Sequence, residues 1–153
     1  MSISLYLTAR CATPVTRSEQ DAVRRIIDES NTTRRPEWIA AYARSSSDSH
    51  LELYGNFECA HLEELGDDLT PPLILWGSAE MPLVDAWDEV VAPLLDHWCS
   101  AFSQIRRIAP AAHWRASLDD FKLEWDEAAR RYRTPAELTP VRYGQSVRFS
   151  RGS

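Results

Sequence analysis

The sequence lacks the segments and spacings on which membrane-bound and nucleotide-dependent proteins rely. Its longest apolar runs, such as residues 73–76, are far shorter than the roughly 20 apolar residues that cross a bilayer. Residues 1–10 alternate apolar and polar side chains and have no charged start followed by an apolar stretch, so no secretory signal is predicted. The five glycines show neither phosphate-loop nor dinucleotide-binding spacing. We therefore predict no cofactor and no membrane association.

Cysteine is also scarce. Cys11, Cys59 and Cys99 are odd in number and far apart, which disfavours a disulfide framework and indicates a reducing compartment. A cytoplasmic location is the resulting prediction.

Basic residues are absent from the middle of the chain. Residues 1–45 hold seven basic and five acidic residues, residues 46–105 hold twelve acidic and no basic residues, and residues 106–153 hold ten basic and six acidic residues. The net charge of −6 therefore originates in one segment. Nucleic-acid binding is disfavoured, because it needs a cationic face that neutralises phosphates.

An anionic surface of this kind can steer a basic protein partner, because clustered charge of one sign raises the rate of encounter with the opposite sign. The other interpretation is a solvated acidic surface that keeps the protein soluble. The predicted partner-binding residues are acids in a stretch expected to be loop and strand edge: Asp48, Glu52, Glu58, Glu63, Glu64, Asp67 and Asp68.

The first half of the chain predicts strands around one helix. Residues 2–8 alternate as a half-buried strand does. Thr16 and Glu19 have the spacing of a capping box, and the helix that follows is expected to end at residues 31–33. A short second helix is expected at 36–43. Strands are expected at 50–58 and 73–77, separated by an acidic loop.

The second half predicts one long core helix and a hairpin. From Pro82 to Ile105, apolar residues recur every three or four positions, and Pro93 predicts a kink or break near Glu89. Residues 114–125 indicate a hairpin that turns at Asp119 and Asp120.

This order of elements predicts an α+β fold. We expect an antiparallel or mixed sheet of four to five strands with two main helices on one face, most similar to a ferredoxin-like sandwich. Residues 1–133 are predicted to form a single domain. Residues 134–153 are expected to be a basic tail or an added strand pair at 141–149.

Local motifs offer few catalytic groups. Cys59, His61, His97 and Cys99 are the residue types of a zinc site, but helix positions two apart point about 200° away from each other. A buried Cys99 and a hydrogen-bonded or exposed His97 are expected instead. Cys59 beside His61 is the only local nucleophile and base pair, and no glycine-flanked nucleophile elbow is present.

Two pairs of adjacent carboxylates could serve acid-base work or hold a divalent ion. They are Asp119 with Asp120 and Asp126 with Glu127, and the first pair also suits a turn. A carboxylate-metal nuclease would also need a lysine nearby, and Lys122 is the only lysine. No metal is predicted.

Residues 94–132 resemble an uncharacterised group of small bacterial proteins of unknown function. The resemblance is carried by a His97-Trp98-Cys99 helix with a basic end, a Trp114-Arg115 strand and the Asp119-Asp120 turn. It implies no activity. In size and charge the chain is also similar to immunity proteins that neutralise bacterial toxins.

The leading hypothesis is a non-catalytic binding protein whose acidic surface meets a basic protein, a toxin in the case of an immunity protein. The alternative is a small ligand-binding domain or enzyme with a pocket lined by Trp76, Trp114 and Trp125, with His97 or Asp119. A third hypothesis is a subunit of a homo-oligomer.

Overall fold

The central element of the fold is β1 (Ser2–Arg10), which pairs with a strand on each side. The computed structural model describes residues 2–13, 15–34, 37, 57–60, 71, 73–82, 92–133, 138–143 and 146–151. The other elements along the chain are α1 (Arg17–Asn31), β2 (Phe57–Ala60), β3 (Leu73–Pro82), α3 (Ala92–Ile108), β4 (His113–Leu118), β5 (Phe121–Lys122), β6 (Trp125–Asp126), β7 (Arg131–Tyr132), β8 (Leu138–Tyr143) and β9 (Ser146–Arg151).

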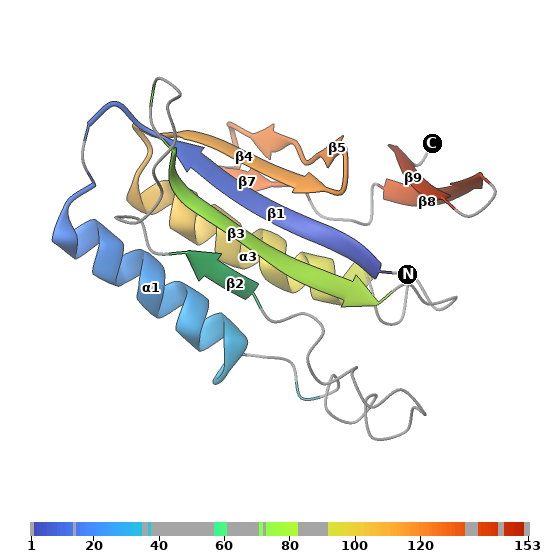
Figure 1. The fold of residues 1–153 in the computed structure, drawn as a ribbon, viewed down its shortest axis with the longest axis horizontal. Coiled ribbons are helices and arrows are strands. Elements are labelled where there is room, and N and C mark those ends of the chain that lie inside the picture. The colour runs from blue at the N-terminus through green and yellow to red at the C-terminus, as the bar shows by residue number, and fades with distance from the viewer. Residues whose placement is uncertain are drawn as a thin grey trace.

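Five strands form one antiparallel sheet in the order β2-β3-β1-β4-β5 (Figure 1). In β1, Leu5, Leu7 and Ala9 are buried while the residues between them are partly exposed, as the alternation in the sequence predicts. The α+β class and the antiparallel sheet are confirmed. The order of β2, β3, β1 and β4 is the one expected of a ferredoxin-like sandwich, but that assignment stays a prediction because the connections at 38–56 and 83–91 lie outside the described residues.

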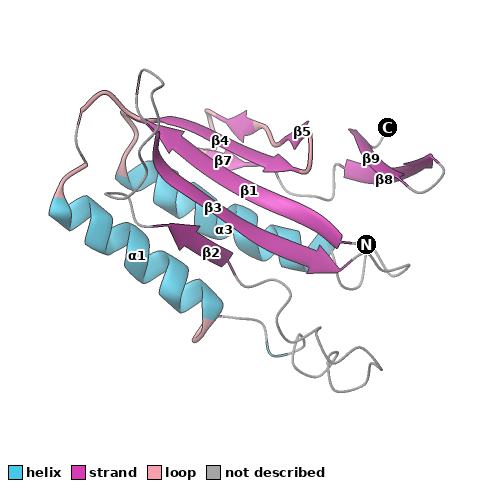
Figure 2. Cartoon of the chain, in the orientation of Figure 1, coloured by secondary structure: helices cyan, strands magenta, loops and turns pink. Residues whose placement is uncertain are grey.

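Both helices pack against one face of this sheet (Figure 2). The buried side of α3 carries Trp98 and Phe102, and Phe57 of β2 packs on both, with ring centroids 5.4 Å and 5.1 Å away. The α1 helix adds Val23 and Ile27 to the same core. The core side chains of the strands point toward these helices, and no helix of the described residues covers the second face of the sheet.

The predicted capping box starts α1. The backbone N–H of Glu19 donates to Thr16 Oγ1 at 3.1 Å, and the backbone N–H of Thr16 donates to the Glu19 carboxylate at 3.0 Å. At the other end, Asn31 closes the outer edge of β2: its side-chain amide donates to the Phe57 carbonyl and accepts from the Phe57 N–H. This amide takes the place of a strand partner at an otherwise open edge.

The extent of β3 and α3 differs from the sequence-based prediction. We expected the long helix to begin at Pro82, but Met81 and Pro82 belong to β3, where Met81 is buried opposite Ile3. The described helix begins at Ala92, so Pro93 lies in its first turn, where a missing backbone donor costs nothing. The alternation of Leu75, Ala79 and Met81 with polar residues was the signal of a longer strand.

The turn at Asp119 and Asp120 is confirmed, but the second strand of the hairpin is shorter than expected: β5 ends at Lys122, and Trp125 belongs to β6, which pairs with β7. Asp119 adopts a φ of 50°, and its backbone N–H and Oδ1 bond to the backbone of Ser4, which ties the turn to β1. The short helix expected at 36–43 falls outside the described residues except for Glu37.

Near the C-terminus, β8 and β9 pair antiparallel. A strand pair therefore occupies the region for which we expected either a tail or added strands, and the division into a domain and a terminal segment stays a prediction. In the described part of the chain, no helix is long and apolar enough to span a bilayer.

Gly77 lies where β2 and β3 meet the aromatic core, and we predict that Gly77→Ala destabilises the fold. A Cβ at this position would overlap the Phe57 ring, which Trp98 and Phe102 hold in place. Overpacking of this kind costs about 1–3 kcal/mol, which lowers the melting temperature of a chain of this size by about 3–10 °C. Thermal unfolding followed by circular dichroism measures this change in melting temperature. Ser78→Ala, one residue along on the open face, is the control, and an equal effect of both changes would contradict the packing argument.

The capping box predicts a pH-dependent contribution to stability. The Thr16 backbone N–H, and then its hydroxyl group, lower the pKa of Glu19 from its ordinary value of 4.5. A lowered folded-state pKa stabilises the fold above that ordinary value, and the contribution is lost as the pH falls through the folded-state pKa. Glu19→Gln should therefore be less stable than the wild type at neutral pH and equally stable in strong acid.

Urea unfolding from neutral pH to strong acid measures the difference in the free energy of unfolding between Glu19→Gln and the wild type. Thr16→Ala should cost about 1 kcal/mol at neutral pH, as loss of an N-cap typically does. A Glu19→Gln deficit that stays constant on acidification would show that the carboxylate charge plays no part.

Candidate functional site

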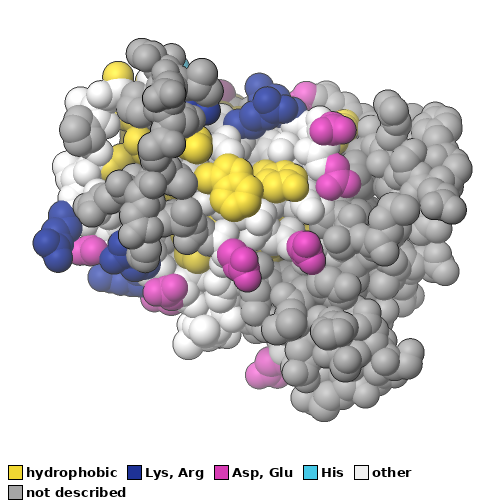
Figure 3. Space-filling view, in the orientation of Figure 1, with side chains coloured by type: hydrophobic (Ala, Val, Ile, Leu, Met, Phe, Trp, Pro, Cys, Tyr) yellow, Lys and Arg dark blue, Asp and Glu magenta, His cyan; other side chains and the backbone are white. Residues whose placement is uncertain are grey.

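The open face of the sheet is the side opposite the helices, and it carries the most exposed large hydrophobic residue of the described chain. Trp76 on β3 remains 41% exposed, and its ring lies 6.2 Å from the Tyr6 ring on β1. Figure 3 shows hydrophobic side chains exposed near the centre of this face, with charged side chains around them. We call Trp76 and Tyr6 the aromatic pair.

The strand register fixes the neighbours of the aromatic pair. Tyr6 lies between Ser78 of β3 and Ser117 of β4, and Ser78 is paired in turn with Glu58 of β2. Trp76 lies opposite Thr8, which pairs with Arg115 on its other side. Because side chains directly opposite each other point to the same face, these residues form two rows that cross the sheet.

Exposed charge changes sign across the open face. Glu58 and Glu80 are exposed on β2 and β3, Glu80 lying opposite Ser4 in the next row, while Arg115 and Lys122 are exposed on β4 and β5. The aromatic pair lies between the acidic and the basic border. The apolar centre of such a surface can bind a partner, and the charged borders can fix the orientation in which that partner binds.

Of the seven acids predicted to bind a partner, the structure describes only Glu58. It is exposed on the open face, at the edge strand β2. The other predicted residues lie outside the described residues: Asp48, Glu52, Glu63, Glu64, Asp67 and Asp68. Whether these acids form one patch with Glu58 is therefore still a prediction.

Sequence reasoning missed the aromatic pair and Glu80. The alternation that placed Leu5 and Leu7 in the core also placed Tyr6 on the opposite face, and the same alternation along β3 exposes Trp76 and Glu80. The signal was present, but without the strand order nothing indicated that Tyr6 and Trp76 lie on adjacent strands.

The three tryptophans of the predicted pocket are not brought together. Trp114 points into the core, where its indole N–H donates to the Ala109 carbonyl at 2.8 Å. Trp125 lies in the small β6–β7 hairpin beneath the Arg106 guanidinium, and Trp76 is on the open face. Since Trp76 and Trp114 occupy opposite faces of the sheet, they cannot line one pocket.

His97 and Cys99 take the separate positions expected of helix residues two apart. The His97 ring lies 3.0 Å from the Ser30 carbonyl of α1, whereas the Cys99 thiol points toward the Arg133 carbonyl. Cys99 is 2% exposed. Burial, and secondarily the nearby Asp96 charge, raises the pKa of Cys99 to about 12, so this thiol is neutral and a poor nucleophile.

The paired carboxylates serve local structure. Asp119 anchors its turn to Ser4, Asp126 accepts from the Ala129 N–H at 3.0 Å, and Glu127 accepts from the Trp125 indole at 2.9 Å. Among the residues that the structure describes, no three His, Cys, Asp or Glu side chains are grouped so that they could hold a metal ion.

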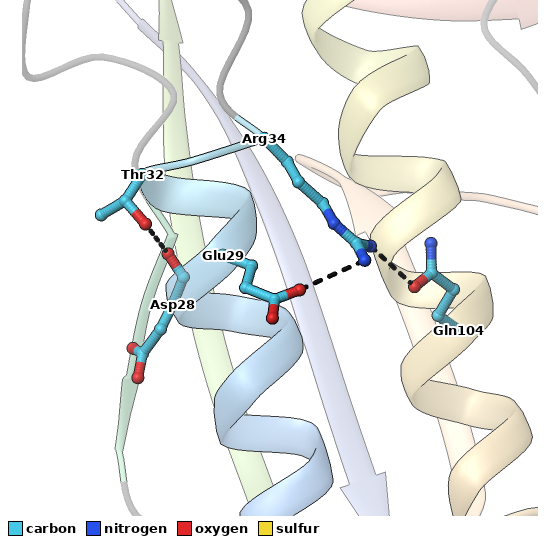
Figure 4. A network of polar contacts seen from close by, with 5 residues as sticks. All are labelled: Asp28, Glu29, Thr32, Arg34 and Gln104. Carbon is cyan, nitrogen blue, oxygen red and sulfur yellow. Dashed lines mark hydrogen bonds and ion pairs between the residues drawn. The ribbon is translucent and has the colours of Figure 1, made fainter.

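A further polar cluster joins the end of α1 to α3 (Figure 4). The Arg34 guanidinium forms an ion pair with Glu29 at 3.2 Å and donates to the Gln104 side chain at 3.3 Å. The Thr32 hydroxyl donates to the Asp28 carbonyl, which closes the last turn of α1. These groups satisfy one another, so we assign the cluster to helix packing and not to ligand binding.

Comparison with known proteins adds no family to this description: no protein-family model, curated protein or solved structure matches the chain. The function is therefore inferred from the geometry of the chain itself.

The buried thiol yields a prediction about reactivity. With a pKa of about 12, roughly one Cys99 thiol in 10⁴ is ionised at pH 8, so iodoacetamide should leave Cys99 unmodified in the folded protein. Peptide mass spectrometry after a timed reaction measures this, with the urea-unfolded protein as the control. Alkylation of Cys99 at the same rate in the folded and the unfolded protein would contradict the assignment of a buried, neutral thiol.

The raised pKa of Cys99 also affects stability. Because the folded-state pKa is raised, the neutral thiol favours folding at neutral pH, and this contribution is lost as the pH rises toward 12.

Proposed function

We propose that this chain is a non-catalytic protein-binding domain that uses the open face of its sheet to bind a basic protein. The observation that carries the proposal is the 41% exposure of Trp76 beside Tyr6, on a face that no described helix covers. Tryptophan and tyrosine are the residues most enriched at the energetic centres of protein interfaces.

The free energy available from burying the exposed surface of Trp76 supports this residue as the anchor of the interface. A tryptophan offers 150–250 Å² of surface, so on the order of 100 Å² of Trp76 can still be buried by a partner. At about 25 cal/mol per Å², burying that surface contributes roughly 2 kcal/mol. This reaches the range that defines an interface hot spot.

The acidic border supports a basic partner. Glu58 and Glu80 lie beside the aromatic pair, and both belong to the segment 46–105, which has no lysine or arginine. Exposed ion pairs contribute only about 0–1 kcal/mol each, so the carboxylates act mainly on the rate of encounter and on the choice of partner. Arg115 and Lys122 on the far side of the face then oppose a misoriented cationic surface.

Among basic proteins, a toxin is the first partner to test. The chain shares its small size and acidic charge with immunity proteins that neutralise bacterial toxins. That analogy gives the choice of partner, whereas the binding face is inferred from Trp76, Tyr6 and the acidic border.

The proposal predicts which substitutions weaken partner binding. Tagged wild type should retain a basic protein from a lysate of the native cell at low salt, and mass spectrometry identifies it. With the purified partner, Trp76→Ala should weaken the dissociation constant about 30-fold, as loss of a hot-spot residue does. Glu58→Lys combined with Glu80→Lys should slow association and reduce its dependence on salt.

Asp28→Lys is the matched control, because Asp28 is an exposed acid on α1, in the helix layer. It should bind as the wild type does. An identified partner that is acidic, or whose affinity is unchanged by Trp76→Ala while the variant remains folded, would contradict the proposed function.

A further inference from the structure

A cleft of about 290 Å³ lies between α3 and the turn that joins β6 to β7. This cleft is separate from the open face, because β7 packs on α3. It is lined by residues from two elements: Asp96, Cys99, Ser100, Ser103 and Arg107 of α3, and Ala129, Arg130, Arg131 and Tyr132 of the hairpin. We call it the arginine cleft.

Three arginines line the arginine cleft, one on α3 and two on the hairpin. Arg107 is held in place by its Nε–H, which donates to the Ser103 carbonyl at 3.1 Å. Arg130 and Arg131 are exposed on the hairpin. Arg24, Arg34 and Arg133 form ion pairs with Asp21, Glu29 and Glu124, whereas Arg107, Arg130 and Arg131 form none among the described residues.

The three arginines outnumber the carboxylates placed near them. Asp126 is the strand partner of Arg131 and offsets part of its charge, while its Oδ1 also accepts from the Ala129 N–H. Asp96 lines the cleft, yet it precedes Arg107 by eleven helical positions, which is roughly 16 Å along the axis. At that distance, in a partly open cleft, solvent and salt screen its charge from Arg107.

The hairpin that carries Arg130 and Arg131 is firmly attached to α3. Arg106 lies 4.2 Å from the centre of the Trp125 ring and donates to the Tyr132 hydroxyl at 3.2 Å. Tyr132 is buried, and its backbone N–H donates to the Ser103 hydroxyl at 2.9 Å. The walls of the cleft are therefore fixed before any ligand arrives, which lowers the entropy cost of binding.

Arg130 occupies a backbone conformation that disfavours its own side chain. Its φ is 53°, in the left-handed region where glycine or asparagine is preferred. A glycine would adopt the same positive φ in this turn at a lower conformational free energy. The presence of arginine at this position is accounted for if its guanidinium group has a role in the cleft.

We propose that the arginine cleft binds the phosphate group of a small phosphate monoester. Guanidinium groups match phosphate oxygens with two parallel hydrogen bonds, and the cleft has Arg107 on its α3 wall and Arg130 and Arg131 on its hairpin wall. The exposed hydroxyl of Ser100 is a further donor in the same cleft. A concave site of about 290 Å³ suits a small molecule better than an extended chain.

The cleft binds its ligand without chemical conversion. Cys99 is the only nucleophilic sulfur in its lining, and burial keeps that thiol neutral. The Ser103 hydroxyl is already used between the Cys99 carbonyl and the Tyr132 N–H. The arginine cleft is independent of the aromatic pair, so either proposal can fail without the other.

Titration of the purified chain with glycerol 3-phosphate tests the proposal, followed by calorimetry and by amide shifts in NMR spectra. Saturable binding should shift residues 129–132 and the α3 residues that line the cleft. Arg107→Gln and Arg131→Gln should each weaken binding about tenfold, as loss of a charged hydrogen bond does. Arg115→Gln removes the same charge from the open face and should leave binding unchanged.

Arg130→Gly separates a binding role from a structural one. It should weaken phosphate-ester binding about tenfold while the melting temperature stays equal or rises, because glycine relieves the positive φ. A rise in melting temperature with unchanged binding would overturn the role of Arg130. Equal losses in Arg115→Gln and Arg107→Gln would reduce the effect to net charge and overturn the site.

Two further titrations define the ligand. Glycerol at the same concentration should not bind, and inorganic phosphate should bind more weakly than the ester. If glycerol 3-phosphate shows no saturable binding in the cleft, the assignment of the arginine cleft as a phosphate-ester site is wrong. If inorganic phosphate binds at least as tightly, the ligand is free phosphate and the assignment to a monoester is wrong.

Discussion

Burial of one face of the sheet beneath two helices is the constraint on which the rest of this structure depends. Leu5, Leu7 and Ala9 of β1 face the same way as Leu75 and Ala79 of β3, and α3 covers them with Trp98 and Phe102. With that face buried, a one-residue shift of register would expose the whole apolar set, so the register is strongly specified. The same alternation directs Tyr6, Trp76 and the charged residues to the opposite face.

Two surfaces of opposite character follow from this layering. The open face combines the exposed Trp76 and the half-buried Tyr6 with acids on one border and bases on the other, which suits a macromolecular surface. On the helix side, α3 and the β6–β7 hairpin form a concave site with three arginines, which suits a small anion. Apolar area dominates the first surface, whereas charged hydrogen bonds dominate the second.

The residue types that first suggested catalysis have structural roles in the fold. His97 contacts the Ser30 carbonyl and so links α3 to α1, while Cys99 is buried on α3 with its thiol 3.8 Å from the Arg133 carbonyl. Asp119 fixes the β4–β5 turn against Ser4. Buried polar groups are usually hydrogen-bonded, and each of these three residues makes such a contact within the fold.

The sequence by itself determined the elements whose signals are local. Period-two alternation predicted β1, the Thr16 and Glu19 spacing predicted the start of α1, and Asp119 with Asp120 predicted the hairpin, because each signal involves residues within a few positions of one another. The same local rule separated His97 from Cys99. It failed at residues 81 and 82, where an apolar pair suited helix and strand equally.

Only the tertiary structure decided which distant residues share a surface. Tyr6 and Trp76 are 70 positions apart and meet because β1 and β3 are neighbours in the sheet. Arg107 and Arg130 converge because Arg106 and Tyr132 hold the hairpin against α3. Such contacts depend on strand order and helix packing, which minimise the free energy of the whole chain and leave no local trace in the sequence.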